Sequence, residues 1–228
     1  MRGVPSLLLA SASPARLATL RSAGLDPAVL VSGVDEPAVV ARYGVTDGED
    51  VALVLARAKA EEVAGREEVP DDALVLGCDS VLELTGPDGE RQVHGKPADA
   101  AQARERWRAM RGRSGVLHTG HWLVDAREDG SGATLGGVAS VTVHFADVTD
   151  EEVDAYVATG EPLAVAGAFT LDGLGGAFVR GVEGDPHAVV GVSLPLLREL
   201  VREAGVSWPE LWTPGARARG ERAGAGGQ

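Results

Sequence analysis

The feature that most constrains the fold is an alternation of strand-like and helix-like segments along most of the chain. Short apolar runs, typical of buried strands, alternate with stretches in which apolar residues recur at helical spacing. This pattern is typical of an α/β layer structure. We therefore predict a mixed, partly antiparallel central sheet flanked by helices, in a single α/β domain over residues 1–213. The predicted strands are 6–10, 28–32, 73–84, 116–126 and 134–146, and the predicted helices are 14–23, 47–64, 99–110, 149–160 and 190–204.

Three segments depart from this alternation. Residues 33–37 are predicted to form a loop that carries two acidic side chains. Residues 167–184 contain six glycines, a density that indicates turns close to a ligand or to another strand. Residues 214–228 are rich in Ala, Gly and Arg without an apolar period, so we expect a disordered tail.

The charge balance limits the kinds of partner. The net charge of −13 argues against binding a nucleic acid polymer, which requires a broad basic face. The net charge is compatible with a small phosphorylated ligand that is bound, together with a divalent cation, in a local basic pocket. The apolar run at residues 7–10 is too short for a secretory signal, and no later run approaches the ~20 residues of a membrane span. The single cysteine, Cys78, fits a reducing compartment, so we expect a cytoplasmic protein, and the sequence leaves a homodimer open.

Only two of the twenty-one basic residues are lysines, Lys59 and Lys96. A compact ammonium on a flexible stem suits a phosphate oxygen beside a metal ion, so both lysines are candidates for phosphate binding. Lys96 stands between Gly95 and Pro97, which would hold it rigidly at the base of a hairpin. Alternatively, the survival of two lysines is due to chance, and the Gly-Lys-Pro sequence around Lys96 is a turn selected for its geometry alone.

A second candidate site lies where the first strand turns into a helix. Ser11, Ser13 and Arg16 place two hydroxyls and a guanidinium beside the free N–H groups of a helix N-terminus, where an anion can bind. In the alternative interpretation Ser13 is only a helix N-cap and Arg16 is a solvated helix residue.

Asp79 is the third candidate, because it places a carboxylate inside the apolar strand 73–84. A buried carboxylate is costly unless it is paired or coordinates a cation, and Lys59, Lys96 or a metal ion could be its partner. The alternative is an aspartate at a strand end that reaches solvent. Loop residues Asp35 and Glu36 could complete an oxygen-ligand site with Asp79 for Mg²⁺ or Mn²⁺.

Other kinds of active site are disfavoured. His118 and His121 are three residues apart in a predicted strand and would point to opposite faces, which argues against a zinc site. Cys78 lies in an apolar strand beside an anion, where its thiolate is disfavoured. The chain has no Gly-x-Ser-x-Gly motif of a serine hydrolase.

Taken together and in order, the motifs of this chain resemble those of the Maf family of nucleoside triphosphate pyrophosphatases. The resemblance runs from Leu7 to about Gly205. It rests on LLASASPAR (8–16), VDE (34–36), ARAKA (56–60), LGCDSV (76–81), GKP (95–97), TG (119–120), GEP (160–162), AGAF (166–169) and VVG (189–191).

The resemblance implies a Maf/ITPase-like fold with an active-site cleft between two lobes. It also implies metal-dependent hydrolysis of a nucleoside triphosphate to the monophosphate and diphosphate in the cytoplasm, with removal of non-standard nucleotides as one purpose. Asp79 would activate the water and Glu36 would position the metal or the base, so these two are the implied metal ligands. The implied phosphate-binding residues are Ser11, Ser13, Arg16, Lys59 and Lys96.

Three departures from the family pattern leave the preferred base open. In the branch of the family that looks selective for dTTP and UTP, the positions of Ala15, Ser80 and Asp172 are occupied by arginine, threonine and glutamine. An ionised aspartate only accepts hydrogen bonds, whereas glutamine donates and accepts, so we expect a different or broader base preference. Two other functions stay open: a nucleotide-binding regulator of cell division with little turnover, and a phosphomonoester hydrolase that releases orthophosphate.

Overall fold

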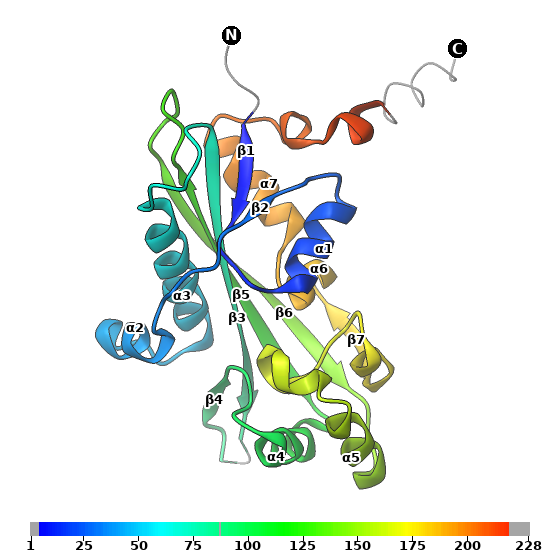
Figure 1. Ribbon diagram of the computed structural model, residues 1–228. Helices are drawn as coiled ribbons and strands as arrows, with labels where there is room; N and C mark the ends of the chain where they lie inside the picture. Colours follow the sequence, from blue (N-terminus) through cyan, green and yellow to red (C-terminus); the bar gives the residue numbers. More distant parts are fainter. Residues whose placement is uncertain (1–4, 87, 219–228) are drawn as a thin grey trace.

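The computed structural model describes residues 5–86 and 88–218 (Figure 1). Within these residues seven strands form one sheet, in which β2-β1-β3-β5-β6-β7 are neighbours and β4 pairs with β3. The strands are β1 (Ser6–Leu9), β2 (Ala28–Val29), β3 (Ala73–Thr85), β4 (Arg91–His94), β5 (Ser114–Asp125), β6 (Thr134–Phe145) and β7 (Val179–Glu183). The α-helices are α1 (Pro14–Ser22), α2 (Glu36–Tyr43), α3 (Gly48–Ala64), α4 (Ala100–Met110), α5 (Asp150–Ala158), α6 (Pro186–Val190) and α7 (Leu194–Glu203). Short 3₁₀ helices are η1 (Glu161–Ala164), η2 (Ala166–Ala168), η3 (Leu174–Phe178) and η4 (Trp208–Leu211).

The sheet is mixed, as predicted. β1 runs parallel to β2 and β3, whereas β4 and β5 pair antiparallel with β3, and β6 and β7 continue the antiparallel series. The long strands β3, β5 and β6 connect two lobes, one with β1, β2, α1 and α7 and one with β4, α4 and α5 (Figure 1). Each lobe has its own apolar core, built around Leu9 and Leu76 in the first and around Trp107 and Phe145 in the second.

Helix α3 lies unusually close to the sheet. A Cβ atom at Gly77 would lie 2.2 Å from the carbonyl oxygen of Ala56, and one at Gly120 would lie 2.2 Å from that of Ala52. Real Cβ contacts are never this short, so only glycine at these two strand positions lets the helix pack where it does. This close packing carries the side chains of α3 directly onto β3.

One edge of β3 is uncovered in its middle. β1 pairs with β3 as far as Leu76, and β4 pairs with it only from Leu82 onward. As far as the described residues show, residues 77–81 therefore have no strand partner on this side. Asp79 lies at the centre of the gap, which falls between the two lobes (Figure 1).

Besides the predicted strand 28–32, of which only Ala28–Val29 forms β2, two predicted elements differ from the structure. The predicted loop 33–37 ends early, because α2 starts at Glu36, where the Asp35 side chain accepts a hydrogen bond from the amide of Ala38. The predicted helix 190–204 is broken at Gly191, which has a φ of 120°, and α7 starts afresh with Ser193 as its N-cap. Local capping in each case outweighs the apolar period along the chain.

The start of the predicted tail is also ordered. Residues 214–218 are helical, and Arg217 Nη2 donates a 2.6 Å hydrogen bond to the carbonyl of Glu210. This contact holds a segment without an apolar period, at the start of the stretch for which the sequence predicted a disordered tail. The rest of that prediction, residues 219–228, lies outside the described residues. Among the described helices, none has both the length and the apolar character that crossing a membrane requires.

Candidate active site

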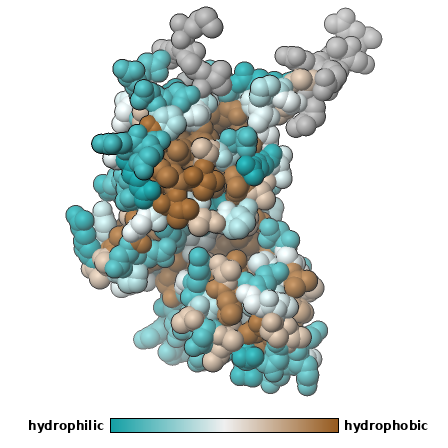
Figure 2. Space-filling view, in the orientation of Figure 1, coloured by the Kyte–Doolittle hydropathy of each residue, from teal (hydrophilic) through white to brown (hydrophobic). Residues whose placement is uncertain are grey.

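A cavity of about 1160 Å³ opens at the gap in the β3 edge. In the space-filling view this middle region is hollowed between the two lobes, with apolar residues gathered near it (Figure 2). The structure brings together at this cavity the site residues that the sequence predicted, except Asp35, whose side chain caps α2 and is not among those that line the cavity. The roles of these residues stay predictions. These residues are Ser11, Ser13, Ala15, Arg16, Glu36, Lys59, Asp79, Ser80, Lys96 and Asp172.

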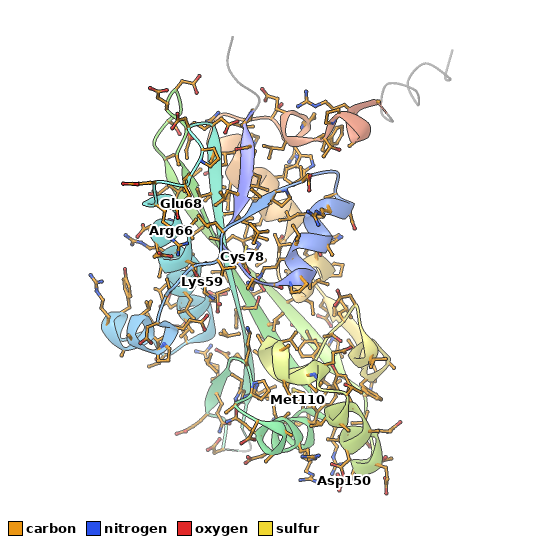
Figure 3. All side chains as sticks on the ribbon, in the orientation of Figure 1. Lys59, Arg66, Glu68, Cys78, Met110 and Asp150 are labelled. Atoms are coloured by element: carbon orange, nitrogen blue, oxygen red, sulfur yellow. The ribbon has the colours of Figure 1, made fainter. Side chains whose placement is uncertain are left out.

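Asp79 is buried in the middle of its strand, with 8% of its surface exposed, and its partner is Lys59. Lys59 Nζ donates to Asp79 Oδ1 and lies 2.7 Å from Glu36 Oε1, so the ammonium sits between the two carboxylates. Figure 3 shows Lys59 extending from α3 toward β3 near Cys78. The alternative of an aspartate at a strand end is therefore wrong. Among the described residues no hydrogen bond reaches the second oxygen, Oδ2.

Burial raises the pKa of Asp79 above its ordinary value, while the charges of Lys59 and Arg16 lower it in part. The removal of water around the carboxylate is the largest cause, since it penalises the charged form. A raised pKa makes this carboxylate a better proton acceptor than an exposed aspartate.

Arg16 is a buried anchor and not a solvated helix residue. Its Nε donates to the carbonyl of Gly191 at 2.8 Å and its Nη1 donates to Ser11 Oγ at 3.0 Å. Ser11 Oγ also accepts from the amide of Ser13, so its own hydrogen is left for another acceptor. Ser13 is the N-cap of α1, as the alternative interpretation held, through a 3.4 Å bond from the amide of Arg16.

Ser80 belongs to a directed chain of hydrogen bonds. Thr119 Oγ1 donates to the carbonyl of Ala188 at 2.8 Å, so it must accept the hydrogen of Ser80, whose Oγ lies 2.9 Å away. Ser80 Oγ in turn accepts from Arg16 Nη2 at 3.2 Å. The Ser80 hydroxyl hydrogen is thus committed inside the protein, and this side chain can offer a ligand only its remaining lone pair.

Lys96 is exposed at the cavity, and no ion pair to it is formed within the described part of the chain. The residue before it is held from two sides: the carbonyl of Gly95 accepts from Arg106 Nη1 at 2.6 Å and from the amide of Gly167 at 3.1 Å. Arg106 is 7% exposed, and burial lowers its pKa. A buried guanidinium therefore fixes the backbone from which Lys96 reaches the cavity.

The predicted metal ligands, Asp79 and Glu36, lie at one place, on either side of Lys59. Carboxylate oxygens suit Mg²⁺ and Mn²⁺, and Mg²⁺ is usually held by one or two carboxylates together with substrate phosphates. Within the described residues no group of three or more His, Cys, Asp or Glu could hold a metal alone. The site thus fits a cation shared with a phosphorylated ligand.

The disfavoured sites have structural explanations. His121 is buried, with its pKa lowered to about 4 mainly by burial, and its Nε2 accepts from the amide of Ser193. Burial raises the pKa of Cys78 to about 12, so this thiol is not a nucleophile at neutral pH. Neither side chain is among those that line the cavity.

Sequence reasoning missed three residues that support the site: Arg106, Thr119 and Glu161. Thr119 and Glu161 lie in motifs that carried the resemblance, but nothing local assigns them a partner. Arg106 gave no signal, because a charged residue in a polar helix is ordinarily solvated. Its partner, the carbonyl of Gly95, comes from a different element.

The fold and the cavity define a class of protein: a two-lobed α/β protein in which a buried aspartate–lysine pair and a serine–arginine cluster face one cleft. Residues 6–204 match the family described as Maf-like protein. The chain belongs to this family.

Several relatives are highly similar, and each is named nucleoside triphosphate pyrophosphatase. The relative from Leifsonia xyli subsp. xyli is 54% identical over 211 residues, 90% of this chain and 96% of its own. That from Salinispora tropica is 56% identical, covering 92% and 88%, and that from Streptomyces coelicolor is 54% identical, covering 91% and 95%. A nucleoside-triphosphatase / dITP/XTP pyrophosphatase structure from Mycobacterium abscessus matches with a TM-score of 0.37 and 15% identity, covering 87% of this chain and 95% of its own. This last likeness is too low to support an argument.

Proposed function

We propose that this chain is a nucleoside triphosphate pyrophosphatase that hydrolyses a (d)NTP to the monophosphate and diphosphate. The observation that carries the proposal is the buried Asp79, paired with Lys59 in a cleft that also holds Ser11, Arg16 and Lys96. A proton acceptor surrounded by donors for an anion is what attack of water on a phosphate requires. The names of the relatives, which span nearly the same length, support the same activity.

In the proposed reaction Asp79 accepts a proton from water while the water oxygen forms a bond to the α-phosphorus. The bond from the α-phosphorus to the bridging oxygen breaks, and the electron pair leaves with diphosphate. Ser11, with its free hydrogen, and Arg16 hold phosphate oxygens, and Lys59 and Lys96 offset the charge that builds on the leaving group. Ser13 adds the hydroxyl at the start of α1.

The charges of the cleft support a metal requirement, which is part of this proposal. Among the described residues that line it, three cationic side chains face three carboxylates, so the lining alone has no excess positive charge for a triphosphate. Asp79 and Glu36 would hold Mg²⁺ or Mn²⁺ together with the substrate. When bound, the cation supplies positive charge to the phosphate oxygens.

We also propose that the base preference differs from strict selection of dTTP and UTP. Ala15, Ser80 and Asp172 all line the cavity, where the dTTP- and UTP-selective pattern has arginine, threonine and glutamine. The Ser80 hydroxyl already donates its hydrogen to Thr119, and the Asp172 carboxylate can only accept hydrogen bonds. These two side chains can therefore accept hydrogen bonds from a nucleobase but cannot donate one to it. We place the enzyme in the cytoplasm, where Cys78 stays reduced, with residues 1–213 as its catalytic domain.

The test is a nucleotide panel with Mg²⁺ in H₂¹⁸O, with products resolved by ³¹P NMR and mass spectrometry. We expect diphosphate and an ¹⁸O-labelled monophosphate, because water attacks the α-phosphorus. Orthophosphate as the first product would favour a phosphohydrolase instead, and binding without products would favour a regulator.

Asp79→Asn is the matched variant for the proposed base. The amide keeps the shape of the side chain but cannot accept the proton, so turnover should fall at least ~10²-fold while nucleotide binding by calorimetry persists. Undiminished turnover by this variant would refute the role of Asp79.

A further inference from the structure

The segment 170–175, which runs from just after η2 to the start of η3, forms one wall of the cavity. Thr170, Leu171 and Asp172 line the cavity, and Asp172 is exposed at its rim. No hydrogen bond to the Asp172 carboxylate is formed by any side chain or amide in the described residues. Lys59 offsets the charges of Asp79 and Glu36, whereas no ion pair within the described residues offsets that of Asp172. This unpaired carboxylate repels phosphate, so the wall faces the nucleoside part of the proposed substrate and not its triphosphate.

A single carboxylate, that of Glu161 in η1, holds this wall. Its Oε1 accepts hydrogen bonds from Tyr156 Oη at 2.9 Å, from the amide of Gly175 at 3.1 Å and from Thr170 Oγ1. Its Oε2 accepts from the amide of Leu174 at 3.1 Å. Three of these four bonds, from Thr170, Leu174 and Gly175, join both ends of the segment to one carboxylate.

The two glycines of this wall fit closely around the same carboxylate. A Cβ atom at Gly173 would lie 2.7 Å from Glu161 Oε2, and one at Gly175 would lie 2.4 Å from Tyr156 Oη. Part of the glycine density noticed in the sequence is thereby explained, since the backbone must pass within hydrogen-bonding distance of Glu161.

Glu161 is suited to this task at neutral pH. Burial would raise its pKa, but hydrogen bonds from Thr170 and from the amides of Gly175 and Leu174 outweigh burial and lower it. The side chain is therefore ionised, and an ionised oxygen accepts stronger hydrogen bonds than a neutral one.

We propose that Glu161 is a positioning residue for substrate selection: it fixes segment 170–175 so that Leu171 and Asp172 meet the nucleoside in one arrangement. The inference rests on the proposed function. Because Glu161 is not among the residues that line the cavity, its effect on the substrate passes through this segment.

The test compares Glu161→Gln with wild type. The glutamine side chain has the same shape, but its NH₂ group donates hydrogen bonds and cannot accept them. The donors that face it lose their acceptor, which releases one end of the segment. We expect KM for the preferred nucleotide to rise roughly tenfold and the kcat/KM ratio between preferred and poor nucleotides to fall by a similar factor, while kcat changes about twofold at most. Amides 174 and 175 should exchange hydrogen faster.

Two further variants keep the test decisive. Tyr156→Phe removes one of the donors to Oε1 and should give a smaller shift in the same direction, even if Glu161→Gln folds poorly. Glu151→Gln changes an exposed glutamate of the same region and should behave as wild type.

Faster exchange of amides 174 and 175 with unchanged KM and unchanged ratios would overturn the proposal, and so would an equal loss of kcat/KM for all nucleotides. If wild type hydrolyses no nucleotide, the proposed function fails by itself. Dissociation constants for the same panel then decide whether Glu161 controls selection.

Discussion

Replacing Lys59 by methionine removes the positive charge that contacts Asp79 and leaves a side chain of similar length. Lys59 Nζ donates to Asp79 Oδ1, and both side chains are about nine-tenths buried, with 11% exposed. Water screens this pair poorly, so the effect on Asp79 should be large.

The magnitude follows from Coulomb's law. Opposite charges ~4 Å apart interact by about 4 kcal/mol at an effective dielectric constant near 20. Because Lys59 favours the ionised form, its removal raises the pKa of Asp79 further above its already raised value.

The assay is the pH profile of kcat/KM. Asp79 must be ionised to accept a proton, so activity is lost as pH falls through its pKa. The acid limb of Lys59→Met should therefore lie at higher pH than that of wild type. Lys96→Met is the control: no ion pair joins Lys96 to Asp79 within the described residues, so this variant should raise KM without moving the limb.

The two-lysine composition allows a direct check. Lysine labelled with ¹⁵N at Nζ should give two side-chain NMR signals, and the chemical shift of the one missing in Lys59→Met should change as Asp79 takes up its proton. If Lys59→Met lowers activity by one factor at every pH, with the acid limb unmoved, then Lys59 does not control the charge of Asp79, and the electrostatic argument fails.

Two further predictions concern the supports of the site. Gly77→Ala forces a Cβ against the carbonyl of Ala56, so we expect the free energy of unfolding in urea to fall by about 1–3 kcal/mol and activity to fall as Lys59 moves. Gly33→Ala is the control: the space around Gly33 is open, so stability and activity should stay unchanged. If Gly77→Ala were equally neutral, the close packing of α3 on the sheet would be contradicted. Arg106→Met releases the carbonyl that precedes Lys96, so KM for nucleotide should rise several-fold with little change in the acid limb. An unchanged KM in this variant would show that Lys96 needs no such anchor.

Much of the fold could be predicted from the sequence because its signals are local. The strand 73–84 is a mostly apolar run, interrupted by Asp79, Ser80 and Glu83. The bounds of the predicted antiparallel pair 116–126 and 134–146 nearly coincide with those of β5 and β6. The predicted helix 149–160 begins with a capping box at Thr149, with the amide of Glu152 donating to Thr149 Oγ1. Errors occurred where one capping residue altered a boundary, at Asp35 and at Gly191.

The candidate site was predictable as a set of residues but not as an arrangement. Asp79 was conspicuous because a carboxylate in an apolar strand needs a partner, yet Lys59, Lys96 and a metal ion stayed equal candidates. Ser80 showed only its residue type, and its directed bonds depend on Thr119 and on the carbonyl of Ala188, which are distant in the chain.

The sequence by itself determined the alternation of strands and helices, the family resemblance and the residues that carry chemistry. Apolar periodicity, helix caps and motifs depend on residues that are close together in the chain. Tertiary structure alone decided that β1 stops at Leu76 and β4 starts at Leu82, which opens the strand edge at Asp79. It also decided that two glycines admit α3 so closely that Lys59 reaches this carboxylate. These contacts join residues distant in the chain, and the burial that sets their charges exists only in the folded protein.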